Sequence, residues 1–136
     1  MNVGILLAAA LLAAPILLAA RNVPETVPFS EAQISRGAEV FVAQCVMCHG
    51  ATGEEAVDWG PALHGESFWK NWEGRPTRAL YSRIISTMPA SEPGILEKQD
   101  VIDVVAFLTG AQPAGQSHVT DPDMLNRARL KNPEAP

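Results

Sequence analysis

The stretch Cys45-Val46-Met47-Cys48-His49 decides the fold, because it holds both cysteines of the 136-residue chain. A disulfide framework elsewhere is therefore excluded. Two cysteines separated by two residues and followed by a histidine are typical of three kinds of site: a redox dithiol, half of a zinc site, or the covalent attachment site of a haem. The rest of the chain decides among these three.

The rest of the sequence supports neither a zinc site nor a redox dithiol. Zinc needs four ligands, and outside the motif only His64, His118 or a carboxylate could complete the set. A redox dithiol usually follows a strand of a βαβ unit, and no alternating strand pattern occurs in this sequence. A haem needs two thioether anchors and an adjacent imidazole, which Cys45, Cys48 and His49 supply. We therefore expect one covalently attached haem c.

An amphipathic helix is predicted to lead into the motif. Ser30 and Gln33 have the spacing of a capping box, and Phe29 with Ile34 has the spacing of a hydrophobic staple. Apolar residues then recur every three or four positions, at Ile34, Ala38, Phe41, Val42 and Cys45. We expect Ile34 and Phe41 to face the core.

A second amphipathic helix is predicted over residues 97–109, where a glycine follows it. Residues 50–96 are rich in Gly and Pro, and one short helix is expected there, around 76–86. Four prolines in residues 112–136 predict an extended surface wrap with a short helix near 123–130. The sequence therefore predicts an all-α fold.

The second axial ligand of the haem iron is predicted to be Met88. It lies 39 residues after His49, Pro89 holds it in an extended conformation, and the final helix follows. A thioether opposite an imidazole favours ferrous iron, which suits an electron carrier. The other methionines and histidines are not expected to bind the iron. Met47 lies between the two anchors, His64 is expected in a loop or on the surface, Met124 in the core, and His118 in solvent.

The N-terminal end is apolar, whereas the remainder is acidic. Residues 1–20 contain no Asp, Glu, Lys or Arg, and their apolar run over 3–20 predicts an export signal or a membrane anchor. A proline-rich tether at 21–29, a haem domain at 30–111 and a tail at 112–136 follow. The formal charge of −5 argues against a nucleic-acid partner. We expect the domain on the periplasmic side of the bacterial inner membrane, either anchored or soluble.

The chain resembles the class I cytochrome c family over residues 30–110. The parts of that family occur in order: Gly37 and Phe41, the motif 45–49, Gly60-Pro61-Ala62-Leu63, Thr87-Met88-Pro89, and Phe107 in the closing helix. The resemblance implies terminal helices packed crosswise around one haem, with close approach at Gly37 and with Phe41 against Phe107. It also implies that the carbonyl of Pro61 holds the ring of His49. The cofactor-binding residues are then Cys45, Cys48, His49, Pro61, Leu63 and Met88, with His49 and Met88 as iron ligands.

Trp72 and Arg75 are candidates to bind the haem propionates, through an indole N–H and a guanidinium. The alternatives are a core aromatic and a solvated charge. Residues 70–83 carry four cations against Glu73, a local balance of +3 that would steer a partner or merely form a solvated face. An acidic loop follows the motif, at Glu54, Glu55 and Asp58.

A narrower resemblance concerns residues 68–76, 88–94 and 113–115, which look like small cytochromes that accept electrons from periplasmic quinoprotein dehydrogenases. The lysine ring of mitochondrial cytochrome c is missing, so docking to a strongly acidic oxidase surface is not expected. We expect a one-electron carrier with a dehydrogenase as donor and a terminal oxidase or another cytochrome as acceptor. The alternative is a haem enzyme or gas sensor with an open sixth position, in which Met88 only packs.

Overall fold

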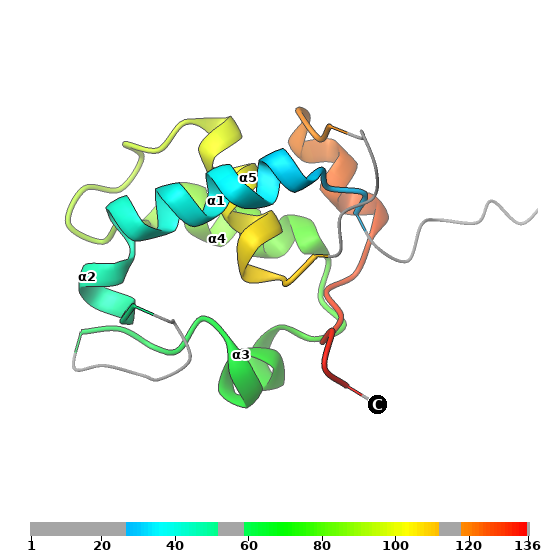
Figure 1. Ribbon diagram of the computed structural model, residues 1–136, viewed down its shortest axis with the longest axis horizontal. Coiled ribbons are helices and arrows are strands. Elements are labelled where there is room, and N and C mark those ends of the chain that lie inside the picture. Colours follow the sequence, from blue (N-terminus) through cyan, green and yellow to red (C-terminus); the bar gives the residue numbers. More distant parts are fainter. Residues whose placement is uncertain (1–26, 52–58, 112–117, 136) are drawn as a thin grey trace, which may run out of the picture.

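The computed structural model describes residues 27–51, 59–111 and 118–135. Within them the chain forms α1 (Glu31–Gln44), α2 (Val46–His49), α3 (Gly65–Trp72), α4 (Thr77–Thr87), α5 (Lys98–Leu108) and the 3₁₀-helix η1 (Pro122–Arg127) (Figure 1). In these ranges, strand-like pairing is limited to one isolated bridge between Pro76 and Arg129. The predicted all-α class is therefore confirmed.

Some predicted features lie outside the described residues: the apolar run 3–20, most of the tether, the acidic loop residues and the segment 113–115. In the described part of the chain, no helix has the length and hydropathy that a membrane crossing needs.

Helices α1 and α5 cross in contact at Gly37 (Figure 1). A Cβ atom at this position would overlap the carbonyl oxygen of Asp103 and lie 3.0 Å from the Cβ of Phe107. Beside the crossing, the ring centroids of Phe41 and Phe107 are 5.2 Å apart. The close approach is confirmed, and it explains a glycine inside a helix, where glycine costs about 1 kcal/mol relative to alanine.

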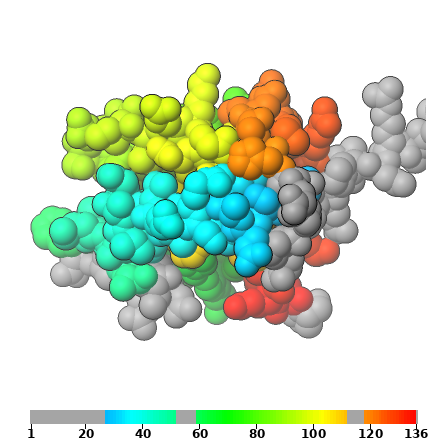
Figure 2. Space-filling view, turned by 45° about the horizontal axis from the view of Figure 1, so that its top comes forward, coloured from blue at the N-terminus to red at the C-terminus, as the bar shows by residue number. Residues whose placement is uncertain are grey.

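Helix α1 buries the predicted residues together with two others. The capping box of Ser30 and Gln33 is present, Phe41 is 1% exposed and Ile34 packs against the core, so these predictions are confirmed. Gln33 and Gly37 are also buried, whereas Val42 is 68% exposed. The outer side of α1 runs across the molecular surface in Figure 2. The apolar spacing does not show that the core here accepts a polar side chain and a glycine.

A buried polar network explains why Gln33 faces inward. Its amide nitrogen donates to Oδ1 of Asp103 at 3.0 Å and to the carbonyl of Val119 at 2.9 Å. Its amide oxygen accepts from the N–H of Val119 at 2.9 Å. Asp103, itself 2% exposed, also accepts from Gln99 at 2.8 Å and from Nε of Arg36 at 2.7 Å. The network joins α1, α5 and the C-terminal region.

Of the other α-helices, α4 and α5 were predicted from the sequence and α3 was not. Helices α4 and α5 lie where they were predicted, within one residue at each end. Helix α3 was not predicted, although Phe68, Trp69 and Trp72 have helical spacing. Gly65, at φ +72°, opens it, and a glycine and a proline follow it closely, so the helix is short and surrounded by turn signals.

The C-terminal region packs on the core more closely than a surface wrap does. Val119, Leu125 and Leu130 are each at most 3% exposed. The helix expected near 123–130 is the 3₁₀-helix η1, whose first turn is capped by Asp121 accepting from the N–H of Asp123. Residues 118–130 therefore supply part of the hydrophobic core.

Candidate haem-attachment site

The two cysteines and the histidine of the motif lie on one short turn at the end of α1. Cys45 ends α1, with its N–H donating to Phe41 at 2.9 Å, and it also begins α2. The N–H groups of Cys48 and His49 both donate to the carbonyl of Cys45, at 3.1 and 3.0 Å. Met47 is 89% exposed, so it points away from the core between the two anchors. The turn therefore presents two thiols and one imidazole as a unit.

The ring of His49 is oriented by a carbonyl from the next segment. His49 is 7% exposed, and its Nδ1 lies 2.8 Å from the carbonyl oxygen of Pro61. A carbonyl can only accept, so Nδ1 carries a proton, and in the neutral imidazole Nε2 then keeps its lone pair. This is the contact that the family resemblance implies. It leaves His49 with one free nitrogen of the kind that binds metal ions.

Gly60 allows this approach, which sequence reasoning did not assign to it. A Cβ at Gly60 would lie 2.6 Å from the carbonyl oxygen of Cys48 and 2.9 Å from Nδ1 of His49. Any other residue would push the chain before Pro61 away from the imidazole. The glycine-proline pair was the available signal, and only the role of the proline was recognised from it.

The two thiols differ in their surroundings. Cys48 is exposed and Cys45 is half-buried. Burial, with a smaller contribution from Cys48, raises the pKa of the Cys45 thiol to about 11. Cys45 is therefore protonated at neutral pH and is not an activated thiolate.

A zinc site also finds no support in the described ranges, where no group of three or more His, Cys, Asp and Glu side chains could hold a metal ion. The donor set fits a haem instead. Two thiols can form thioethers, and the free nitrogen of His49 can bind iron, which are the requirements of haem c.

Met88 is placed at the end of α4. Its N–H donates to Ile84 at 2.9 Å, its backbone is extended, and its half-buried side chain packs against the core. Leu63 is also half-buried against the core. No measured contact joins Met88 to His49, so its role as an iron ligand stays a prediction.

The competing candidates lie elsewhere in the structure. Met124 packs against the hydrophobic core and His118 is exposed, as expected. His64, expected to be a loop or surface residue, is half-buried at the start of α3, and its ring meets the edge of Phe107 at 5.5 Å between centroids. It belongs to the packing around the α1–α5 crossing.

The propionate candidates form a stacked pair. The guanidinium carbon of Arg75 lies 5.4 Å from the ring centroid of Trp72, which packs in turn against Phe68 at 6.3 Å between centroids. Trp72 is half-buried and Arg75 is exposed. In the described part of the chain, no carboxylate lies within ion-pair distance of Arg75, unlike Arg36 and Arg78.

Comparison with known proteins supports a cytochrome c domain. Residues 32–108 match the sequence family described as cytochrome c oxidase, cbb3-type, subunit III. The chain is 32% identical over 85 residues to a protein named thiosulfate dehydrogenase of Psychrobacter arcticus, a match that covers 58% of this chain and 26% of that protein. The sulfane dehydrogenase SoxCD of Paracoccus pantotrophus has a similar fold, with a TM-score of 0.53 at 21% identity over 74% of this chain and 54% of that chain. The chain thus spans about a quarter of the first relative and about half of the second.

Proposed function

The chain belongs to the cytochrome c family of cbb3-type oxidase subunit III, and from this premise we propose that it is a one-electron carrier with a single covalent haem c. The observation that carries the proposal is the 2.8 Å contact between Nδ1 of His49 and the carbonyl of Pro61. It orients an imidazole beside two thiols on the same turn. Such an arrangement suits haem attachment, because both anchors and the iron ligand lie on one turn.

When bound, haem c supplies a reversible one-electron couple between ferric and ferrous iron. In our proposal Cys45 and Cys48 would anchor the haem, His49 and Met88 would be its iron ligands, and Leu63 would pack against it. Hydrogen bonding to Pro61 keeps the lone pair of His49 directed at the iron. The thioether of Met88 raises the reduction potential by favouring the ferrous state. No residue of the chain is assigned to making or breaking bonds of a substrate.

The partners we propose are redox proteins, with a dehydrogenase as donor and a terminal oxidase or another cytochrome as acceptor. Two observations support this. The matching family is described by an oxidase subunit, and the similar proteins are named as dehydrogenases. The narrower link to quinoprotein dehydrogenases stays a prediction.

We further propose that the haem domain works on the periplasmic side of a bacterial inner membrane. The apolar run 3–20 supports export, and its length supports retention as an anchor. Intact-mass measurement of the native protein tests the anchor. A mass that includes residues 1–20 and one haem supports it, whereas a mature chain that begins near Arg21 rules it out.

Spectroscopy tests the carrier. We expect the protein, produced together with a haem-attachment system, to contain one haem that survives acid extraction because it is covalently bound. In the oxidised protein we expect the weak absorption band near the red edge of the visible spectrum that reports sulfur bound to iron. Ready binding of carbon monoxide by the ferrous protein, with no such band, would show an open sixth position and favour an enzyme or gas sensor. Absence of covalent haem would overturn the proposal.

A further inference from the structure

A C-terminal segment, residues 128–130, is hydrogen-bonded along the turn that joins α3 to α4, residues 73–76. The N–H of Gly74 donates to the carbonyl of Leu130 at 2.8 Å, and the N–H of Leu130 donates to the carbonyl of Arg75 at 2.8 Å. The second of these bonds and the bond from the N–H of Thr77 to the carbonyl of Ala128 flank the isolated bridge between Pro76 and Arg129. The turn is therefore paired with a segment about 55 residues further along the chain.

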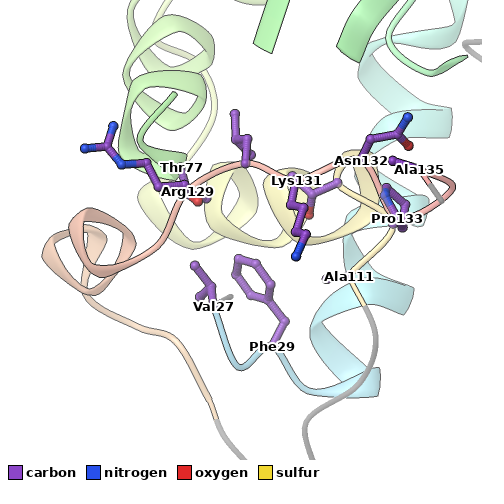
Figure 3. A pocket seen from close by; sticks show the side chains of 12 residues that line it. Val27, Phe29, Thr77, Ala111, Arg129, Lys131, Asn132, Pro133 and Ala135 are labelled. Carbon is purple, nitrogen blue, oxygen red and sulfur yellow. The ribbon is translucent and has the colours of Figure 1, made fainter. Parts of the chain in front are cut away.

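One more backbone hydrogen bond and two side-chain hydrogen bonds add to this pairing. Thr77 donates to the carbonyl of Ala128 through its N–H at 3.1 Å and through its hydroxyl at 3.2 Å. Arg129 donates to the carbonyl of Gly74 at 3.2 Å. Figure 3 shows Thr77 and Arg129 next to each other at one end of a pocket that Leu130 also lines. Thr77 and Leu130 are each 3% exposed, so water does not compete easily for these bonds.

Trp72 and Arg75, the two residues proposed to bind the haem propionates, lie directly before this turn and within it. Trp72 ends α3, and Arg75 stacks over its ring from the turn itself. The side chain of Arg75 is exposed and has no carboxylate partner among the described residues. The position of its guanidinium is therefore set by the stacking on Trp72 and by the backbone of Arg75, whose carbonyl accepts from the N–H of Leu130.

We propose that the C-terminal segment 128–130 is a positioning element of the haem site, which fixes the turn so that Arg75 and Trp72 can bind the haem propionates. This inference rests on the proposed function. A guanidinium held beside the propionates offsets their negative charge and disfavours the additional positive charge of ferric iron. Loss of the positioning should lower the midpoint potential of the haem.

The test compares Leu130→Pro with Leu130→Ala in the full-length holoprotein. Both variants lose the buried leucine side chain, but only the proline removes the N–H that donates to Arg75. We expect a lower midpoint potential in Leu130→Pro than in Leu130→Ala. Each variant is then combined with Arg75→Ala, and we expect the difference between proline and alanine to vanish in that background, because it acts through Arg75.

Equal potentials of the two variants, or a difference that persists after Arg75→Ala, would overturn the inference. If Leu130→Pro does not fold, Thr77→Val decides in its place, with Thr77→Ser as the variant that keeps the hydroxyl bond to Ala128. Thr77→Val should lower the potential and Thr77→Ser should restore it. Covalent haem and the sulfur-to-iron band are recorded on the unmodified protein. Their absence would refute the proposed function, whereas their presence with unchanged potentials would refute only the positioning role.

Discussion

The side-chain amide of Gln33 and the backbone of Val119 exchange two hydrogen bonds of 2.9 Å across 86 residues of sequence. The amide of Gln33 pairs with Val119 as a peptide group would, so the N–H and the carbonyl of this fully buried residue are both hydrogen-bonded. The same amide donates to Asp103. One glutamine thus joins α1, α5 and the C-terminal region.

Replacing this glutamine should destabilise the protein. Gln33→Leu has a similar volume but leaves the buried N–H of Val119 without its partner, whereas the carbonyl of Val119 still accepts from Gln99 at 3.2 Å. An unsatisfied buried group costs about 1–3 kcal/mol, so we expect a loss of about 1–3 kcal/mol in the free energy of unfolding, measured by urea denaturation of the holoprotein. Gln44→Leu, on the exposed side of the same helix, should change it by less than about 0.5 kcal/mol. Equal effects of the two substitutions would contradict the assigned role.

Substitution at the helix crossing should also destabilise. Helix propensity alone predicts that Gly37→Ala gains about 1 kcal/mol. The added Cβ would overlap the carbonyl of Asp103, and forcing an atom into a packed interface typically costs about 1–3 kcal/mol. We expect net destabilisation in thermal unfolding. Ala43→Gly, at an exposed position of the same helix, measures the effect of helix propensity alone. If Gly37→Ala stabilises the protein by as much as Ala43→Gly destabilises it, the crossing tolerates a methyl group.

Replacement of Met88 should change the coordination of the haem iron rather than the fold. In Met88→Ala we expect the sulfur-to-iron band to disappear, the midpoint potential to fall, and the ferrous protein to bind carbon monoxide. The matched control is Met124→Ala, since Met124 is another half-buried methionine packed on the core. It should keep the band and exclude carbon monoxide. A Met88→Ala protein with an unchanged spectrum would exclude Met88 as the ligand.

Removal of the anchors should prevent folding. A chain of this size buries about two-thirds of its unfolded surface, and we expect the haem to supply the remaining core and to stabilise the native state by binding only to it. Cys45→Ala combined with Cys48→Ala should therefore yield a largely unfolded chain by circular dichroism. Met47→Ala, within the same motif, should fold and attach haem normally. A cooperative thermal transition in the double variant without haem would contradict the prediction.

The sequence carries most of the fold where the signal is local. The capping box at Ser30 and the two later helices could be predicted, because capping and periodicity each have a specific physical cause. The close approach at Gly37 and the role of Pro61 were predicted from a family resemblance. The geometry confirms the contact of Pro61 with His49.

The features that were missed depend on residues far apart in the chain. Gln33 has a polar side chain, and nothing nearby in sequence indicates that Val119 and Asp103 will satisfy it. Hydrogen bonds between residues 73–77 and 128–130 are mostly between backbone groups, which leave no pattern in the side chains. Helix α3 was missed because the glycines and the proline around it indicate turns, and this signal outweighs the helical spacing of its aromatic residues.

The two hydrogen bonds between Gln33 and Val119 also have a consequence for the order of folding. Contacts that span most of a chain form late, since a large loop must close before they contribute. Helix α1 and its cysteines are local and can form early, whereas the buried amide finds its partner only after Val119 has arrived. We therefore expect the haem motif to be complete before the C-terminal region closes over the core. If the chain is exported as we propose, haem could then be attached while its last residues are still in transit.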